Sequence, residues 1–276
     1  MQAMTHEELD ADLALLRAAA VSAGIMAMGY FRRDIKTWTK ENASPVSEAD
    51  MLVDEFLGET LLAARPEYGW LSEETADDPD RLQRDRVFIV DPIDGTRGFL
   101  RGDDAWTVAL SVVEAGRPKV GVVYAPARDE LFEARAGGGA LLNSAPLITR
   151  HHHGDKVVIP APSAVLKHLG DLGVDYVHGP ALPSLAYRLL QVATGVYDLA
   201  LARRGAQDWD IAASDIILEE CGITLEDVCS GPPQYNRENL RHGALAATRD
   251  SSLRSKAHLA LRSVYGCPDE SDTQKD

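Results

Sequence analysis

The chain has 276 residues, of which 45% are hydrophobic and 26% charged, a composition sufficient for one large or two ordinary globular domains. Its formal net charge of -15, from 43 acidic and 28 basic residues, is opposite to that of most proteins that bind nucleic-acid polymers. Composition therefore excludes a disordered or fibrous chain and argues against a polynucleotide partner.

The first residues, MQAMTHEELDADLALL, carry acids where a signal peptide has basic residues. The longest uncharged stretch, AAAVSAGIMAMGYF, is too short to span a bilayer. Cys221, Cys229 and Cys267 are odd in number and form no C-x-x-C pair, which argues against a disulfide framework or a zinc knuckle. We therefore expect a soluble cytoplasmic protein, a monomer or homodimer, with no membrane partner.

The first half of the chain predicts two helices followed by a sheet. An apolar repeat at helical spacing predicts one long helix over residues 5–33 that covers the sheet. SEADMLVDEFLGETLLAA predicts a second helix, with Ser47 as its N-cap and Asp50 in its first turn. From residue 87, the segments VFIV, WTVALSVVEAG and KVGVVYAP have the pattern of strands, and the last two predict a hairpin around residues 114–118.

The second half alternates between strand and helix patterns after a seam at TRHHHGDK. The expected elements are a strand at 157–159, a helix after Ser163, a strand at 174–178 and helices over 183–195 and 208–221. This alternation predicts an α/β organisation. We expect a catalytic α+β domain over residues 1–150, an α/β domain over 151–267 that completes the substrate site, and a disordered tail over 268–276.

The segment DPIDGT carries the first chemical signal. Asp91 and Asp94 follow an apolar run that predicts a strand buried on both faces, and open α/β sheets place their sites at the carboxyl ends of such strands. The amides of Gly95 and Thr96 can hold an anion if a helix begins there. Two such close acids repel unless a cation lies between them, and Mg²⁺ suits oxygen ligands. The alternative is an Asp-rich turn with helix caps.

Two further acidic segments repeat the pattern. Glu73 and Glu74 follow a short apolar run, where ordinary surface charge is the alternative. Asp208 or Asp210 begins the helical segment QDWDIAASDIILEECG, where an Asp is also a common N-cap. The segments together favour a metal site over separate caps and surface charges.

The segments DPIDGT, SEE, SPVSEAD and WDIAASDIILEECG, in their order and spacing, resemble the inositol monophosphatase superfamily of Mg²⁺-dependent, lithium-sensitive phosphatases over nearly the whole chain. KENASPVSEAD, LSEE, GVVYAP and PPQYN are most similar to the bacterial 3'(2'),5'-bisphosphate nucleotidases, which remove the 3'-phosphate from adenosine 3',5'-bisphosphate. The resemblance implies a layered α/β/α/β/α sandwich that binds two or three Mg²⁺ ions and a small phosphate monoester.

The resemblance also implies roles for particular residues. The metal ligands at matching positions are Glu73, Asp91, the Ile93 carbonyl, Asp94 and Asp210. Asp50 and Thr96 match the pair that orients the attacking water, and Glu73 completes this catalytic set. Gly95 and Thr96 match the turn that holds the phosphate, and Lys40 matches a lysine of the preceding loop.

The sequence departs from the family pattern at Gly98, Ser214 and Cys221, changes expected to reshape the substrate wall. Arg203, Arg204, Tyr187 and Arg188 are candidates to contact the adenine and the 5'-phosphate. The alternative substrates are inositol 1-phosphate or another sugar phosphate, and the alternative class is a non-catalytic phosphate- or metal-binding regulator. The three histidines at 151–153 predict a solvated loop, the glycine-rich ARAGGGALLN a turn between strands, and the four dispersed tryptophans core or loop anchors.

Overall fold

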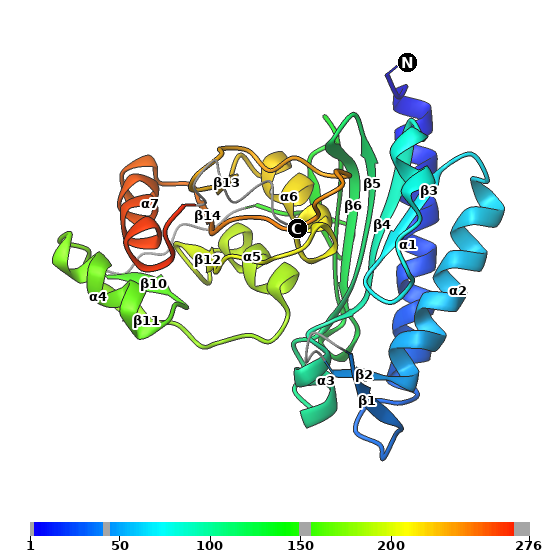
Figure 1. Ribbon diagram of the computed structural model, residues 1–276, viewed down its shortest axis with the longest axis horizontal. Helices are drawn as coiled ribbons and strands as arrows, with labels where there is room; N and C mark the ends of the chain where they lie inside the picture. Colours follow the sequence, from blue (N-terminus) through cyan, green and yellow to red (C-terminus); the bar gives the residue numbers. More distant parts are fainter. Residues whose placement is uncertain (1–2, 41–44, 149–155, 268–276) are drawn as a thin grey trace.

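The computed structural model describes residues 3–40, 45–148 and 156–267, which form five stacked layers of helices and sheets (Figure 1). The outer layer on one side consists of α1 (His6–Met28) and α2 (Glu48–Ala64). The second layer is a seven-stranded sheet, and the third consists of α5 (Leu185–Thr194) and α6 (Asp208–Glu220). A small sheet and the pair α4 (Ser163–Asp171) and α7 (Ser251–Tyr265) complete the stack. The predicted α/β/α/β/α sandwich is confirmed.

The large sheet has the strand order β3-β4-β5-β6-β7-β8-β9, and only β3 and β4 are parallel neighbours. Its strands are β3 (Gly69–Ser72), β4 (Arg86–Asp94), β5 (Thr107–Glu114), β6 (Arg117–Ala125), β7 (Glu130–Arg135), β8 (Ala140–Leu142) and β9 (Ala145–Pro146). The predicted hairpin is the antiparallel pair β5 and β6. The glycine-rich segment forms the predicted turn, between β7 and β8.

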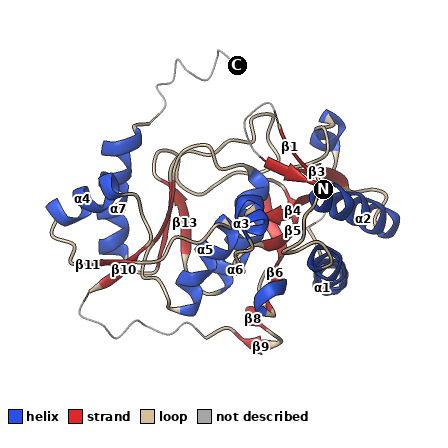
Figure 2. Cartoon of the chain, turned by 90° about the horizontal axis from the view of Figure 1, so that it is seen from below, coloured by secondary structure: helices blue, strands red, loops and turns tan. Residues whose placement is uncertain are grey.

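The remaining elements are short. The small sheet has the order β12-β14-β13, with β12 (Ala200–Ala202), β14 (Leu245–Thr248) and β13 (Thr224–Asp227). Two further pairs are β1 (Thr37–Thr39) with β2 (Pro45–Ser47) and β10 (Val157–Ile159) with β11 (Tyr176–His178). The six-residue helix α3 (Thr96–Arg101) follows β4 and lies at the lower end of the large sheet in Figure 1, and Figure 2 shows the chain from below.

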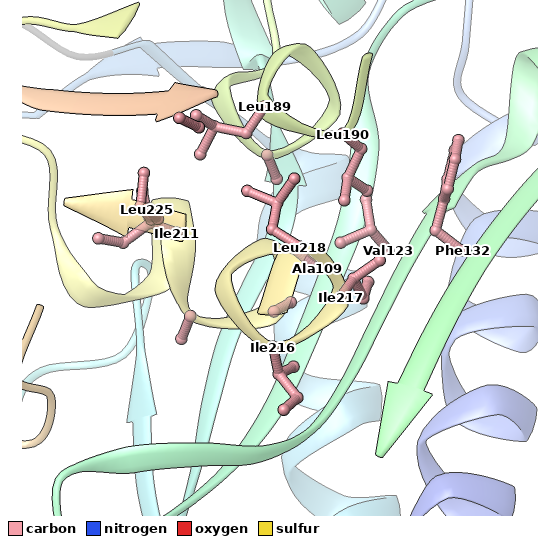
Figure 3. Close-up of a cluster of buried hydrophobic side chains, with 14 of the residues drawn as sticks. Ala109, Val123, Phe132, Leu189, Leu190, Ile211, Ile216, Ile217, Leu218 and Leu225 are labelled. Atoms are coloured by element: carbon pink, nitrogen blue, oxygen red, sulfur yellow. The ribbon is translucent and has the colours of Figure 1, made fainter. Parts of the chain in front are cut away.

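Three hydrophobic cores join the layers. Val87 and Ile89 of β4 enter the core shared with α5 and α6, whereas Phe88 and Val90 enter the core beneath α1 and α2. β4 is therefore buried on both faces, as predicted. Figure 3 shows the first of these cores, in which side chains of the large sheet meet those of α5, α6 and β13. The proposed division at residue 150 lies outside the described residues and stays a prediction.

α1 ends at Met28, five residues before the predicted end. The chain turns after Gly29, and Arg32 in this turn has a left-handed φ of 59°. The Arg32 guanidinium donates hydrogen bonds to the Gly102 carbonyl. Among the described residues, α1 is the one helix long and apolar enough to cross a membrane. In this fold its buried stripe, which includes Leu16 and Ala20, packs on the large sheet.

One expectation about the cysteines is wrong. Cys229 and Cys267 form a disulfide, with Cα atoms 5.7 Å apart, and Cys221 takes no part in it. The pairing arises because α7 runs back along the small sheet and returns its last residues to the loop after β13. The predicted seam, the three histidines and the tail at 268–276 lie outside the described residues.

Candidate active site

Asp91 and Asp94 lie at the carboxyl end of β4, where the register with β5 is irregular. Asp91 is 1% exposed, and one of its oxygens accepts a hydrogen bond from the Ile93 N–H at 3.0 Å. The strand core is too apolar to solvate a carboxylate, so the irregular end turns both acids toward the edge of the sheet. The expected position of these two acids is confirmed.

The start of α5 holds Asp94 in place. The Asp94 carboxylate accepts hydrogen bonds from the Ser184 hydroxyl at 2.6 Å, the Ala186 N–H at 2.7 Å and the Leu185 N–H at 3.2 Å. A helix N-terminus offers unpaired N–H groups, which favour an anion there. Sequence reasoning missed Ser184, although a Ser before an amphipathic helix is an N-cap signal.

Asp210 joins the two acids of β4 from α6. It is the third residue of that helix, and its carboxylate accepts the Gln207 N–H at 2.6 Å in a capping arrangement. One oxygen from each of Asp91, Asp94 and Asp210 lies within 4.8 Å of the others. Three carboxylates from two distant segments, β4 and α6, therefore meet at one point.

Glu73 lines the same cleft from the end of β3. Its carboxylate lies 3.3 Å from the Lys40 ammonium, which also pairs with Glu74 at 2.8 Å and donates to the Glu73 carbonyl at 3.1 Å. Lys40 thus lies beside the acids, and its phosphate-binding role stays a prediction. The two glutamates raise the pKa of the Lys40 ammonium against the opposing effect of burial.

Asp50 and Thr96 are brought together as expected. The Thr96 hydroxyl lies 3.1 Å from Asp50 Oδ1 and 3.0 Å from the Ile93 carbonyl oxygen. Ser47 caps α2 and donates to Asp50 Oδ2 through its N–H at 2.8 Å and its hydroxyl at 2.5 Å. This fixes Asp50 in the first turn of α2 and leaves the Thr96 hydroxyl between a carboxylate and a carbonyl.

The acids of the cleft have raised pKa values. Burial, followed by the charge of Asp94, raises the pKa of Asp210 to about 8. Burial, with Glu73, Asp94 and Asp210 adding to it, raises the pKa of Asp91 well above its usual value. Burial also raises the pKa of Glu74 to about 7. The charged forms of these acids are therefore costly without a cation, and a hard divalent ion with oxygen ligands fits this donor set.

The turn after β4 requires a glycine at position 95. Gly95 has a φ of 92°, and a Cβ there would lie 2.9 Å from the Ser184 nitrogen. A side chain at this position would therefore be strained and would collide with α5. Gly95 and Thr96 both line the cleft.

The cleft has a volume of 640 Å³ and is lined by acidic side chains and by a set of arginines, here called the basic wall. The basic wall contains Arg188, Arg203, Arg204 and Arg241. Within the described part of the chain, none of these four side chains has an ion pair, and the buried Arg188 Nε has no hydrogen-bond partner. An anion is the natural partner for such guanidinium groups.

Some substrate-wall expectations are wrong. Tyr187 is buried in the core, where its hydroxyl donates to Glu130 at 2.5 Å, so it does not line the cleft. Ser214 is buried within α6 and donates to the Ile211 carbonyl, and Cys221 caps the far end of that helix. Sequence reasoning missed Arg241 and placed Trp209 as an anchor, yet both line the cleft.

The departure at Gly98 has a steric origin. A Cβ on Gly98 would lie 2.5 Å from Pro183 Cγ and 2.6 Å from Pro183 Cβ. We expect Gly98→Asn to lower the free energy of unfolding by about 1–3 kcal/mol, because the added side chain would overpack the contact with Pro183. Thermal unfolding measures this loss, and the double variant with Pro183→Gly should recover most of it relative to Pro183→Gly alone. Full stability of Gly98→Asn would contradict this explanation.

Buried and half-buried acids from three segments that line one cleft are typical of a metal-dependent phosphatase. Residues 8–263 match the sequence profile of the inositol monophosphatase family. The chain therefore belongs to the inositol monophosphatase family and is a phosphoric monoester hydrolase.

Individual relatives agree with this assignment. The chain is 30% identical to a 3'(2'),5'-bisphosphate nucleotidase CysQ of Aggregatibacter actinomycetemcomitans, over 79% of this chain and 85% of the relative. It is 31% identical to a histidinol-phosphatase of Mycobacterium tuberculosis, over 83% of this chain and 91% of the relative. The crystal structure of extragenic suppressor protein suhB from Bartonella henselae superposes with a TM-score of 0.77 at 27% identity, over 91% of this chain and 98% of that one.

Proposed function

We propose that this protein is a Mg²⁺-dependent phosphomonoesterase that hydrolyses the 3'-phosphate of adenosine 3',5'-bisphosphate to give AMP and phosphate. The single observation that carries the catalytic part is the convergence of Asp91, Asp94 and Asp210, with ligand atoms within 4.8 Å of one another. Neutral water attacks a phosphate monoester very slowly, because the phosphate oxygens repel the nucleophile. A site that concentrates carboxylates suits this reaction only if it also binds cations.

The residues at the site would have separate roles in catalysis. Glu73, Asp91, the Ile93 carbonyl, Asp94 and Asp210 would hold two or three Mg²⁺ ions. Bound Mg²⁺ supplies Lewis-acid charge and lowers the pKa of a coordinated water. Thr96 lies within hydrogen-bond distance of Asp50, so the two would orient that water and take up its proton. The amides of Gly95 and Thr96 would hold the phosphate.

The basic wall supports a substrate that carries a second anionic group. Arg188, Arg203, Arg204 and Arg241 line the cleft without ion pairs among the described residues, in a chain whose net charge is -15. Pro183, Leu185 and Trp209 add apolar surface, which suits an adenine ring. Inositol 1-phosphate offers neither a second phosphate nor a planar ring.

A substrate panel tests the proposal. Phosphate release is measured with adenosine 3',5'-bisphosphate, inositol 1-phosphate, histidinol phosphate and fructose 1,6-bisphosphate. Several substrates are compared because the chain is 30% identical to a nucleotidase and 31% identical to a histidinol-phosphatase. We expect the highest kcat/KM for the nucleotide. A preference for inositol 1-phosphate or histidinol phosphate would overturn the proposed substrate and keep the phosphatase assignment.

The double variant Arg203→Ala/Arg204→Ala should lower kcat/KM for adenosine 3',5'-bisphosphate by at least about a hundredfold, because charged hydrogen bonds contribute roughly 1.5–3 kcal/mol each and two arginines are removed. Activity on inositol 1-phosphate should change by less than about threefold, since this substrate has no second phosphate for the arginines to bind. Lys167→Ala, an exposed cation on α4, is the control for altered net charge. Equal losses on both substrates would contradict the assignment of the arginines.

The predicted cytoplasmic location stays a prediction. The disulfide between Cys229 and Cys267 weighs against it, because structural disulfides are rare in reducing compartments.

A further inference from the structure

The end of the segment PPQYN packs against α6 without lining the cleft. The Tyr235 hydroxyl donates to Asp215 Oδ2 at 2.9 Å, and the Asn236 N–H donates to Asp208 Oδ2 at 2.7 Å. Both acceptors belong to α6, and Asp208 lies two residues before Asp210. Two residues of this segment therefore hold the helix that carries a proposed metal ligand.

His242 completes the contacts of Asp208. Its Nε2 lies 2.7 Å from Asp208 Oδ1, and the two residues are 5% and 0% exposed. The His242 N–H donates to the Ala206 carbonyl at 2.8 Å, and the Gly205 N–H donates to the His242 carbonyl at 2.9 Å. Both carboxylate oxygens of Asp208 thus have hydrogen-bond partners. The backbone of His242 is also hydrogen-bonded to Gly205 and Ala206, which lead into α6.

Arg81 connects this network to the other side of the metal site. Its side chain is buried, and Nη1 donates to Asn236 Oδ1 at 2.6 Å while Nη2 donates to the Arg237 carbonyl at 3.0 Å. The same guanidinium pairs with Asp77, at 2.6 Å and 2.9 Å. Asp77 lies in the loop that begins with Glu73. A continuous chain of polar contacts, exposed only at Asp77 on the loop side, therefore runs from the Glu73 loop to the start of α6.

We propose that Arg81, Asn236 and His242 are positioning residues that fix Asp210 relative to the Glu73 loop and so set the metal affinity of the site. A fully satisfied buried network is rigid, and removing one member leaves a buried partner without its hydrogen bond. Groups that orient metal ligands typically change metal affinity by about 10- to 100-fold when they are removed. The inference rests on the proposed function in one respect, which is that the carboxylates bind a divalent metal.

Direct titration of the metal-free protein with Mn²⁺, followed by calorimetry, tests the proposal without an activity assay. We expect His242→Ala to weaken Mn²⁺ binding by about tenfold. His242→Gln should bind within about threefold of the unsubstituted chain, because its side-chain amide can still donate to Asp208. Asn236→Gly is a second variant, since glycine accepts the left-handed φ of 55° at this position and removes only the contact with Arg81.

His258→Ala is the matched control, because His258 is a partly buried histidine on α7 that lies 3.2 Å from the Glu226 carboxylate. It should lower the unfolding temperature in EDTA without weakening Mn²⁺ binding. Unchanged Mn²⁺ affinity in both His242→Ala and Asn236→Gly, or an equal loss in His258→Ala, would overturn the inference. Absence of Mn²⁺ binding by the unsubstituted chain would overturn the proposed function as well, so the two failures are distinguishable.

Discussion

Asp91→Asn is expected to lower kcat by at least about a thousandfold, which corresponds to about 4 kcal/mol of activation free energy, while the protein stays folded. The charges of Glu73, Asp94 and Asp210 all act on Asp91, and its substitution would remove one of the proposed metal ligands. Phosphate release at saturating substrate and Mg²⁺ measures the change. Activity within tenfold of the unsubstituted enzyme would contradict the assigned role.

The same substitution should raise the unfolding temperature measured in EDTA. It removes like-charge repulsion, and the asparagine carbonyl can still accept the Ile93 N–H. Asp94→Asn is the informative comparison, because three donors from Ser184, Leu185 and Ala186 point at Asp94 and an amide NH₂ group would face one of them. We expect this second variant to be less stable than the unsubstituted protein. A destabilised Asp91→Asn variant would contradict the claim that the Asp91 carboxylate is repelled by its acidic neighbours.

The metal-free protein is expected to lose stability as the pH rises from about 5 to about 8. The pKa values of Asp91, Glu74 and Asp210 are raised in the folded state, the last two to about 7 and about 8. The unfolded chain therefore loses these protons first as the pH rises, and stability falls until the folded-state pKa values are passed. The loss should be several kcal/mol, or on the order of 10 °C in unfolding temperature.

Bound Mg²⁺ should reverse this trend, because it favours the ionised carboxylates. Thermal unfolding at pH 5, 6, 7 and 8, with EDTA and with excess Mg²⁺, measures the effect. The stabilisation by Mg²⁺ should be larger at pH 8 than at pH 5, and Asp91→Asn should show a shallower pH dependence in EDTA. A metal-free protein that becomes more stable across this range would contradict the assigned pKa shifts.

Local signals predicted much of this site. The run VFIV before Asp91 predicted a strand buried on both faces, and Ser47 predicted the cap that places Asp50 in the first turn of α2. Each of these signals depends only on neighbours in the sequence, such as an apolar run or a capping residue. The resemblance of the acidic segments to the inositol monophosphatase superfamily then implied that they would converge.

Contacts between distant segments were not predictable in this way. Three such contacts are the hydrogen bonds from the start of α5 to Asp94, the Asp208–His242 pair and the close approach of Pro183 to Gly98. They join residues that are 34 to 90 positions apart in the sequence. The disulfide likewise joins cysteines 38 residues apart. Such contacts depend on how helices dock on the sheet, which no local pattern of residues reports.

The most direct test of the account is phosphate release from adenosine 3',5'-bisphosphate by enzyme first dialysed against EDTA and then titrated with Mg²⁺. The account predicts no turnover after dialysis and full recovery on addition of Mg²⁺, because the converging carboxylates of Asp91, Asp94 and Asp210 would need the divalent ion to act on the phosphate. Undiminished turnover in EDTA would contradict the central claim that this carboxylate cluster works as a metal site.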